Sequence, residues 1–349
     1  MSEQACATIS PGPGLARLRR ACSGTEAYLG LVLIALVAVI TLVSPRFLTG
    51  ENLLAILLSY SYLGIFAIGF LFVLLSGGID VSFTAIATVA QYLMALLLLH
   101  HPGVPWPVAV LLPMAVGVVL GCVNAALIHA FDAPPIIITI ANLNIYYGIL
   151  QFASNGEWIY DFPDWFNRFP RTLVLTFVNG NGVKYGLSVL TVIWLATAAV
   201  AGFLLVWTRA GRRLYAMGGN LEAARRAGIG ILRYRLFAYG FLGFTAGLGG
   251  LVHTLITQTV APNTLVGHEF DVVAAVVLGG ANIFGGSGSV TGTLLGVLLI
   301  AVITNALTIM KVPAYWHQVF IGAVVLASIA MTSANERRSA RRERRRHAA

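Results

Sequence analysis

The sequence predicts an all-α membrane protein, a polytopic helical bundle of about ten transmembrane spans with both termini on the cytoplasmic side. Of its 349 residues 58% are hydrophobic and only 10% are charged, whereas soluble domains carry about 25% charged residues. The apolar residues form runs of roughly 17 to 25, and about 20 helical residues cross a ~30 Å hydrocarbon core. These unbroken runs exclude a transmembrane β-barrel, whose strands alternate apolar and polar residues.

The apolar runs divide the chain into three parts. A cytoplasmic N-terminal segment (1–26) precedes the transmembrane domain (27–332), and a basic cytoplasmic tail (333–349) follows it. The first apolar run lacks a small-residue cleavage site, so we expect an uncleaved span. Spans are expected near residues 27–44, 53–76, 81–99, 106–130, 135–154, 186–207, 235–257, 270–284, 290–310 and 314–332, with a cytoplasmic loop at 208–234 and an external loop at 155–185.

The distribution of charge fixes the orientation. The net charge is +9, and of 22 basic residues three lie in the N-terminal segment, seven between 209 and 235 and seven in the tail. An even number of spans before residue 208 places all three groups on one side, as the positive-inside rule requires. The charge therefore reflects membrane topology and indicates no nucleic-acid surface, and the tail is interpreted as a topology anchor.

The 208–234 loop contains a short helix with recognisable ends. Asn220 can cap it, Glu222 complements the helix dipole, and Gly228 can end it. From the residues alone, an amphipathic connector on the lipid surface and a docking element for a partner explain this helix equally well.

This loop resembles the coupling loop of ATP-binding-cassette (ABC) importer permeases, and most closely the simple-sugar branch related to ribose permeases. In that branch the run reads much like G-R-x-x-Y-A-x-G-G-N-x-E-A-A-R-x-x-G-I. Three further stretches resemble the same branch, in the same order: 75–82, which is similar to T-G-G-I-D-L-S; 269–280 continued at 285–296; and 306–318. The resemblance spans about residues 50–330. It fails at 83–85, where V-G-S is more usual, and in the external loop.

The resemblance implies a transport subunit and no enzyme. The chain would form the gated path for a simple sugar or a related small polar solute in the bacterial cytoplasmic (inner) membrane, crossing it several times. An external solute-binding protein would deliver the solute, a second copy or a paralogue would complete the permease, and a cytoplasmic ATPase subunit would bind ATP and magnesium, so this chain itself needs no cofactor. The residues expected to couple it to the ATPase are Gly218, Gly219, Asn220, Glu222, Ala223, Ala224 and Gly228.

Residues Gly77, Gly78, Asp80 and Ser82 form a candidate gate or helix break. The two glycines permit a tight break, and a carboxylate at the start of the next span is favoured by the helix dipole. A carboxylate near membrane depth is also costly and is often functional. Helix capping and gating therefore both remain open for Asp80.

Uncharged polar residues within the predicted spans are candidates for lining a translocation path. Such groups can hydrogen-bond to a hydroxyl-rich solute, and hydrogen bonds between helices explain them equally well. The candidates are Gln91, Asn124, Asn142, Asn144, Thr304 and Asn305.

Other chemistry has little support in the sequence. The histidines and three cysteines show no metal-binding spacing, and no G-x-x-x-x-G-K-[ST] run is present. No catalytic residues are proposed, because an intramembrane enzyme would need paired carboxylates, a metal cluster or an activated nucleophile. An ion-coupled secondary transporter is the main alternative, but it would normally place ionisable residues inside its spans, where this chain has almost none.

Overall fold

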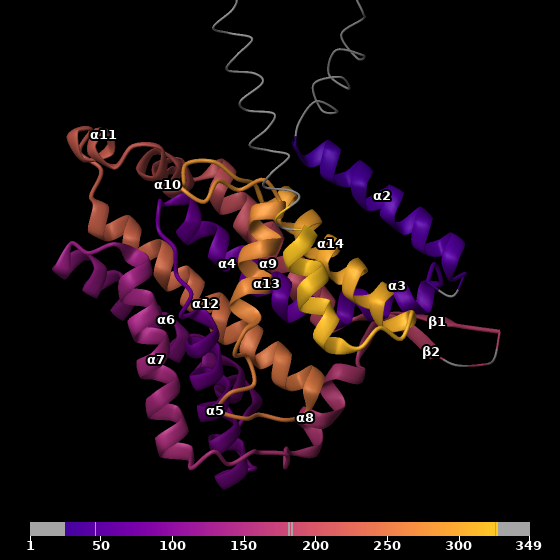
Figure 1. The fold of residues 1–349 in the computed structure, drawn as a ribbon. Helices are drawn as coiled ribbons and strands as arrows, with labels where there is room; N and C mark the ends of the chain where they lie inside the picture. Colours follow the sequence, from indigo (N-terminus) through magenta and orange to yellow (C-terminus); the bar gives the residue numbers. More distant parts are fainter. Residues whose placement is uncertain (1–24, 46, 181, 183, 325, 327–349) are drawn as a thin grey trace, which may run out of the picture.

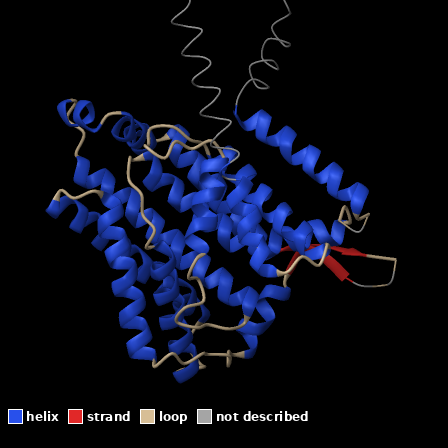
Figure 2. Cartoon of the chain, in the orientation of Figure 1, coloured by secondary structure: helices blue, strands red, loops and turns tan. Residues whose placement is uncertain are grey.

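A computed structural model describes residues 25–45, 47–180, 182, 184–324 and 326 of the chain. This part is mainly helical, with one small β-hairpin (Figures 1 and 2). Its elements are α2 (Thr25–Val43), α3 (Gly50–Ser59), α4 (Ser61–Leu75), α5 (Phe83–His100), α6 (Trp106–Phe131), α7 (Pro135–Ser154), α8 (Asp164–Arg168), η1 (Phe169–Arg171), β1 (Leu173–Val178), β2 (Lys184–Ser188), α9 (Val189–Trp207), α10 (Arg209–Gly219), α11 (Leu221–Arg226), α12 (Ile231–Thr257), α13 (His268–Leu278) and α14 (Val290–Ile309).

The structure confirms a polytopic helical bundle. Within its described residues, seven helices are long and apolar enough to cross a membrane, and α3 with α4, bent by 49°, adds an eighth if the pair is one span. The expected span at 270–284 is wrong as a full span. It is replaced by α13, whose 11 residues are about 16 Å long at 1.5 Å per residue. A glycine-rich segment with positive φ at four glycines follows α13 and prevents the helix from continuing.

The structure describes only part of the chain at its two ends. The expected last span begins as a helix at residue 314, and its end at 332 lies outside the described residues. So do most of the N-terminal segment 1–26 and the whole tail 333–349. The count of ten spans and the cytoplasmic position of both termini stay predictions.

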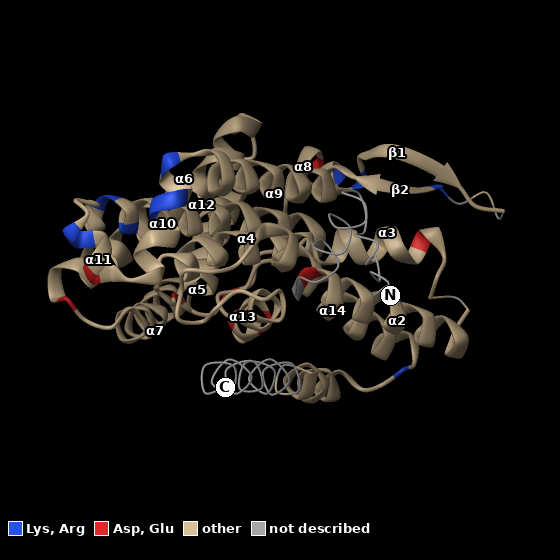
Figure 3. Cartoon of the chain, turned by 90° about the horizontal axis from the view of Figure 1, so that it is seen from above, with Lys and Arg blue, Asp and Glu red and all other residues tan. Residues whose placement is uncertain are grey.

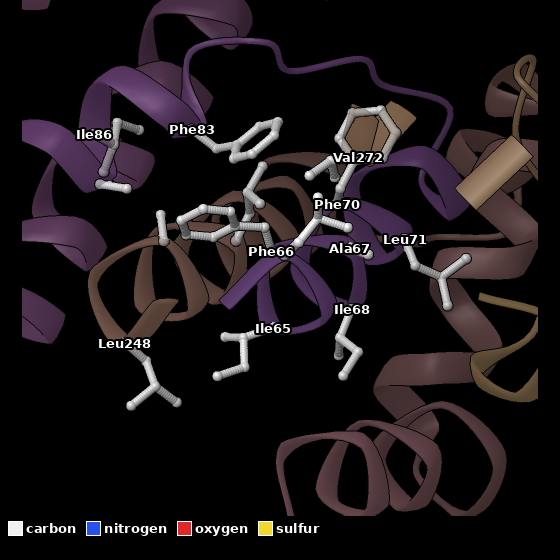
Figure 4. Close-up of a cluster of buried hydrophobic side chains, with 14 of the residues drawn as sticks. Ile65, Phe66, Ala67, Ile68, Phe70, Leu71, Phe83, Ile86, Leu248 and Val272 are labelled. Atoms are coloured by element: carbon white, nitrogen blue, oxygen red, sulfur yellow. The ribbon is translucent and has the colours of Figure 1, made fainter. Parts of the chain in front are cut away.

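Helix α4 forms the centre of the core. Fourteen of its 15 residues are buried, because it is apolar on all sides and other helices surround it. Its side chains pack against Phe83 and Ile86 of α5, Leu248 of α12 and Val272 of α13 (Figure 4). A central helix covered in this way positions the segment that follows it, residues 76–82, in which Gly78, Asp80 and Ser82 are buried.

Glycines bring α6 and α12 into close contact. A Cβ at Gly117 would lie 2.0 Å from the carbonyl oxygen of Gly243, and one at Gly121 would lie 2.3 Å from that of Tyr239. Gly292 and Gly296 of α14 approach Gly279 and the end of α13 in the same way. Small residues that allow backbones to approach are typical of membrane helix interfaces. Both sets of glycines thus serve helix packing.

The external loop 155–185 is more ordered than its turn residues indicate. It contains α8, η1 and most of an antiparallel hairpin in which β1 pairs with β2, and the hairpin projects from the bundle (Figure 2). Phe177 pairs with Tyr185 across the two strands. Between the strands, the amide of Gly182 donates to the carbonyl of Asn179 at 3.0 Å. The sequence analysis does not predict this hairpin.

Candidate gate and coupling site

Helices α10 and α11 form the loop at one end of the bundle. Thr208 caps α10 by accepting from the amide of Gly211, at 3.3 Å. Asn220 caps α11: its Oδ1 accepts from the amide of Ala223 at 2.9 Å. Gly228 follows α11 with φ of +77°, the left-handed conformation that ends many helices. The structure confirms the short helix that the sequence predicts after Asn220, and adds α10 before it.

The face that α11 exposes is small and charged. Ala224 is buried against the bundle, while Glu222 and Ala223 are exposed. Glu222 forms an ion pair with Arg225 at 3.5 Å, in which both side chains are more than half exposed, so the pair adds little to stability. Viewed from this end, Lys and Arg gather around α10, α11 and the start of α12 (Figure 3). The exposed side of α11 is therefore available to a partner.

Glycines from three segments that are far apart in sequence meet beneath this loop. We call Gly77, Gly218, Gly219, Gly285 and Gly286 the glycine junction. A Cβ at Gly218 would lie 2.1 Å from the carbonyl oxygen of Leu75, one at Gly285 would lie 2.7 Å from the Cα of Gly77, and one at Gly286 would lie 2.8 Å from the Cα of Gly219. Gly77, Gly285 and Gly286 also have positive φ. At Gly285 and Gly286 only glycine satisfies both the close approach and the backbone conformation.

Two hydrogen bonds hold the glycine junction together. The amide of Gly286 donates to the carbonyl of Leu75, at 3.3 Å. The hydroxyl of Tyr215, on α10, donates to the carbonyl of Gly288, at 2.8 Å, and partial burial raises the pKa of this phenol, which keeps it protonated as a donor. The end of α4, helix α10 and the segment before α14 thus form one contact (Figure 1).

Asp80 lies below the glycine junction, on the non-helical segment between α4 and α5, and is completely buried. Its Oδ1 accepts from the amide and from the hydroxyl of Ser82, each at 2.7 Å. Its Oδ2 accepts from Nδ2 of Asn124 at 2.9 Å. Ser82 is the N-cap residue of α5, so Asp80 orients the residue that begins α5 and ties it to α6.

Asn124 extends this network to α7. Its Nδ2 also donates to Oγ of Ser82 at 2.7 Å. Its Oδ1 accepts from Nδ2 of Asn142 at 2.7 Å and from the hydroxyl of Tyr146 at 3.2 Å. We call Asp80, Ser82, Asn124, Asn142 and Tyr146 the Asp80 network. Irregular backbone at membrane depth requires that its surroundings satisfy its polar groups, and Asp80 supplies such a partner for the amide of Ser82.

The other four path candidates lie elsewhere. Gln91 of α5 accepts a hydrogen bond from Thr254 of α12 at 3.2 Å. Asn305 of α14 exchanges hydrogen bonds with Asn52 of α3, at 3.0 and 3.1 Å. Thr304 and Asn144 bond to carbonyls of their own helices. The structure does not bring the six candidates together: only Asn124 and Asn142 join the residues of the candidate gate.

Glu269 is a buried carboxylate that the site prediction omits. It is 7% exposed, and its Oε2 accepts from the hydroxyl of Thr84 at 3.2 Å and from the amide of Gly267 at 3.0 Å. The first turn of α5 therefore meets the first turn of α13, and both helices begin inside the bundle. The sequence places Glu269 next to the expected span at 270–284, where it would lie outside the membrane. The signal in the sequence that could have identified Glu269 as a site residue is its position at the start of the stretch 269–280, which resembles the permease family.

Comparison with known proteins agrees with this geometry. Residues 52–329 match the model of a family described as the branched-chain amino acid transport system / permease component. The chain belongs to this family. The match includes the glycine junction, the Asp80 network and the α10–α11 loop, so the expectation of a permease subunit is confirmed.

Individual relatives cover most of the chain. The ribose import permease protein of Bacillus subtilis is 32% identical over 313 residues, covering 86% of this chain and 90% of the relative. The ribose import permease protein of Haemophilus influenzae is 29% identical over 304 residues, covering 86% and 90%. The autoinducer 2 import system permease protein of Photorhabdus luminescens is 29% identical over 297 residues, covering 85% and 86%. No solved structure matches the chain.

Proposed function

We propose that this chain is the membrane-spanning permease subunit of an ABC importer in the bacterial cytoplasmic membrane, and that it carries a simple sugar or a related small polar solute. The glycine junction is the observation that carries this proposal. Through it, α10 touches the end of α4 and the segment between α13 and α14. A force applied to the α10–α11 loop by a partner would therefore act directly on the two places where membrane helices are broken.

The proposal assigns ATP hydrolysis, with its magnesium, to a separate cytoplasmic subunit. The capped helix α11, with Glu222 and Ala223 exposed, would sit in a groove of that ATPase. An external solute-binding protein would deliver the solute at the opposite end of the bundle, where α8 lies (Figure 1). The relatives that support a sugar-like solute are ribose and autoinducer 2 import permeases, so ribose and autoinducer 2 are the first solutes to test.

The coupling role of α11 can be tested with the complete importer. We expect Glu222→Arg combined with Gly228→Trp to abolish solute-stimulated ATP hydrolysis. The first change reverses the charge of the exposed face, and the second places a bulky residue where φ is +77°. The measurement is ATP hydrolysis by the chain reconstituted with its ATPase and binding protein, with and without solute.

Two matched controls accompany this test. Asp132→Arg reverses an exposed carboxylate on another loop, and Gly103→Trp adds bulk where no atom lies within 4 Å of the Cβ position. Both should keep the stimulation. If the chain instead moves solute alone along a proton or sodium gradient, and is indifferent to ATP and to the substitutions at Glu222 and Gly228, the ion-coupled secondary transporter replaces the ABC permease as the proposed function.

A second permease copy, or a paralogue, fits against α7. This helix is among the most exposed of the spans, with Ile137, Ile149 and Phe152 all more than half exposed. Asn144 lies on its exposed surface, in the middle of a 20-residue span. An amide facing lipid is unfavourable, and membrane helices commonly bury such groups against a neighbouring helix. The polar wall of a path between two subunits would place Asn144 in this way.

Cysteine cross-linking tests this placement. In a chain whose own three cysteines are replaced by serine, Asn144→Cys should form a cross-linked dimer under mild oxidation, because the two α7 helices would face each other. Val119→Cys, on the exposed side of α6 and 61% exposed, is the control and should remain monomeric. Equal cross-linking of the two variants would show that α7 does not form the interface between the two copies.

A further inference from the structure

We propose that the groove between α11, the end of α6 and the start of α12 binds an anionic phospholipid. The groove has a volume of about 1030 Å³, at the upper end of the ~300–1,000 Å³ typical of ligand pockets. It lies beside the face of α11 assigned above to the ATPase. The proposal concerns a separate ligand and does not depend on the function proposed for that face.

The groove lies at the level where lipid head groups are expected. Helices α6 and α12 both pass the length and hydropathy test for membrane spans, and they end at Phe131 and begin at Ile231 on this side of the bundle. His129 lies two residues before the end of α6, and Arg233 lies in the first turn of α12. Both therefore line the groove at the ends of these two spans.

The chemistry of the groove matches a phospholipid. Its rim carries Arg225, Arg233 and His129, all exposed. Arg225 pairs with Glu222 only at the surface, and Arg233 forms no ion pair within the described part of the chain. Guanidinium groups bind phosphate well because their planar donors match its oxygens. Basic pockets between membrane helices are a recognised form of lipid site.

Apolar side chains form the remainder of the groove. Leu232, Leu236 and Phe237, on the first two turns of α12, also line it and are partly exposed. An acyl chain can lie along these side chains while its phosphate meets the arginines. A small soluble anion would use the rim and leave this apolar surface in water, so the lipid accounts for more of the groove.

Such a lipid would bridge elements that the transport cycle must move. Arg225 belongs to α11, Arg233 belongs to α12, and the linker at 229–230 between these helices also lines the groove. A bound phosphate that contacts both arginines would therefore restrain the angle between α11 and the span that follows it. The ease with which α11 moves would then depend on the anionic lipid content of the membrane.

Lipid retention by the purified chain tests the proposal directly. The chain is delipidated in detergent, equilibrated with equal amounts of phosphatidylglycerol and phosphatidylcholine of the same acyl chains, and examined by native mass spectrometry. Wild type should retain phosphatidylglycerol preferentially. Arg225→Gln with Arg233→Gln should weaken this preference by about 30-fold, the effect expected for removing two arginines near a phosphate.

Matched variants distinguish lipid binding in the groove from a general effect of positive charge. Arg209→Gln with Arg212→Gln removes two exposed arginines of α10 that do not line the groove, and should leave the preference unchanged. Arg225→Lys with Arg233→Lys keeps the positive charge and should retain most of the preference for phosphatidylglycerol. Glycerol 3-phosphate at equal concentration should not displace the lipid. All variants are compared for helix content and for a single species in gel filtration.

Three results would overturn the proposal. In the first, wild type shows no preference for phosphatidylglycerol. In the second, the glutamine variant of the groove loses no more lipid than the α10 control. In the third, the glutamine variant keeps its lipid but no longer retains the ATPase subunit in a pull-down, which would assign the groove to a protein contact. Failure of ATPase coupling alone would leave the lipid site standing.

Discussion

Gly218→Val is expected to disconnect the α10–α11 loop from the membrane helices and to abolish transport. A Cβ at this position would lie 2.1 Å from the carbonyl oxygen of Leu75 and 2.4 Å from the amide nitrogen of Gly286. Both neighbours are backbone atoms, which cannot turn aside as a flexible side chain could. Overpacking of this kind typically costs ~1–3 kcal/mol. The junction would relieve the clash by separating α10 from the end of α4.

This result should differ from that of a damaged docking face. Because α11 itself is unchanged, Gly218→Val should still retain the ATPase subunit in a pull-down, whereas Glu222→Arg with Gly228→Trp should lose it. Solute uptake and solute-stimulated ATP hydrolysis should both fall at least about ten-fold, the change that ~1.4 kcal/mol produces in a rate. The measurement uses the complete importer in vesicles.

The chain supplies a close control for this prediction. A Cβ at Gly219 meets no atom within 4 Å, although Gly219 is the next residue and also belongs to the glycine junction. Gly219→Val should therefore retain most of the uptake of the wild type. Wild-type uptake by Gly218→Val would show that the contact between α10 and Leu75 is not part of the mechanism.

Much of the fold follows from local sequence, because long apolar runs and their flanking charges are local signals. The capped helix α11 is equally local: Asn220 and Gly228 mark its ends within nine residues. Span 270–284 shows the limit of hydropathy, since an apolar composition continues through a segment whose glycines adopt positive φ and end the helix early. The sequence analysis also misses the hairpin formed by β1 and β2, because the turn residues beside its strands are typical of a loop.

The sites illustrate a second limit. Residue type identifies Gly77, Asp80 and Asn124 as candidates and the family resemblance adds Gly218, but their arrangement depends on tertiary contacts. Nothing local indicates that Gly77 approaches Gly285 across more than 200 residues, or that Asn124 rather than Gln91 reaches Asp80. Glu269 is missed for the same reason, because its burial depends on α5 and α13 both starting inside the bundle.

Asp80→Ala is expected to destabilise the chain and to abolish transport. Asp80 is the acceptor in three hydrogen bonds, from the amide of Ser82, the hydroxyl of Ser82 and Nδ2 of Asn124. Its removal leaves these donors without that partner inside the bundle, and each unsatisfied buried group costs ~1–3 kcal/mol. The non-helical segment before α5 would lose its attachment to α6. The thermal unfolding temperature of the purified chain and solute uptake by the complete importer should both fall.

A double-mutant cycle distinguishes the hydrogen bonds from the mere presence of a side chain. Asp80→Asn keeps the shape but turns an amide group toward the amide of Asn124, so it should lower uptake. Adding Asn124→Asp restores one donor facing one acceptor, and uptake should partly recover, with a coupling energy of ~0.5–3 kcal/mol. Asp132→Asn, at an exposed carboxylate, is the control and should have no effect. Additive losses in the cycle would mean that Asp80 and Asn124 act independently, and would remove the Asp80 network from the gate.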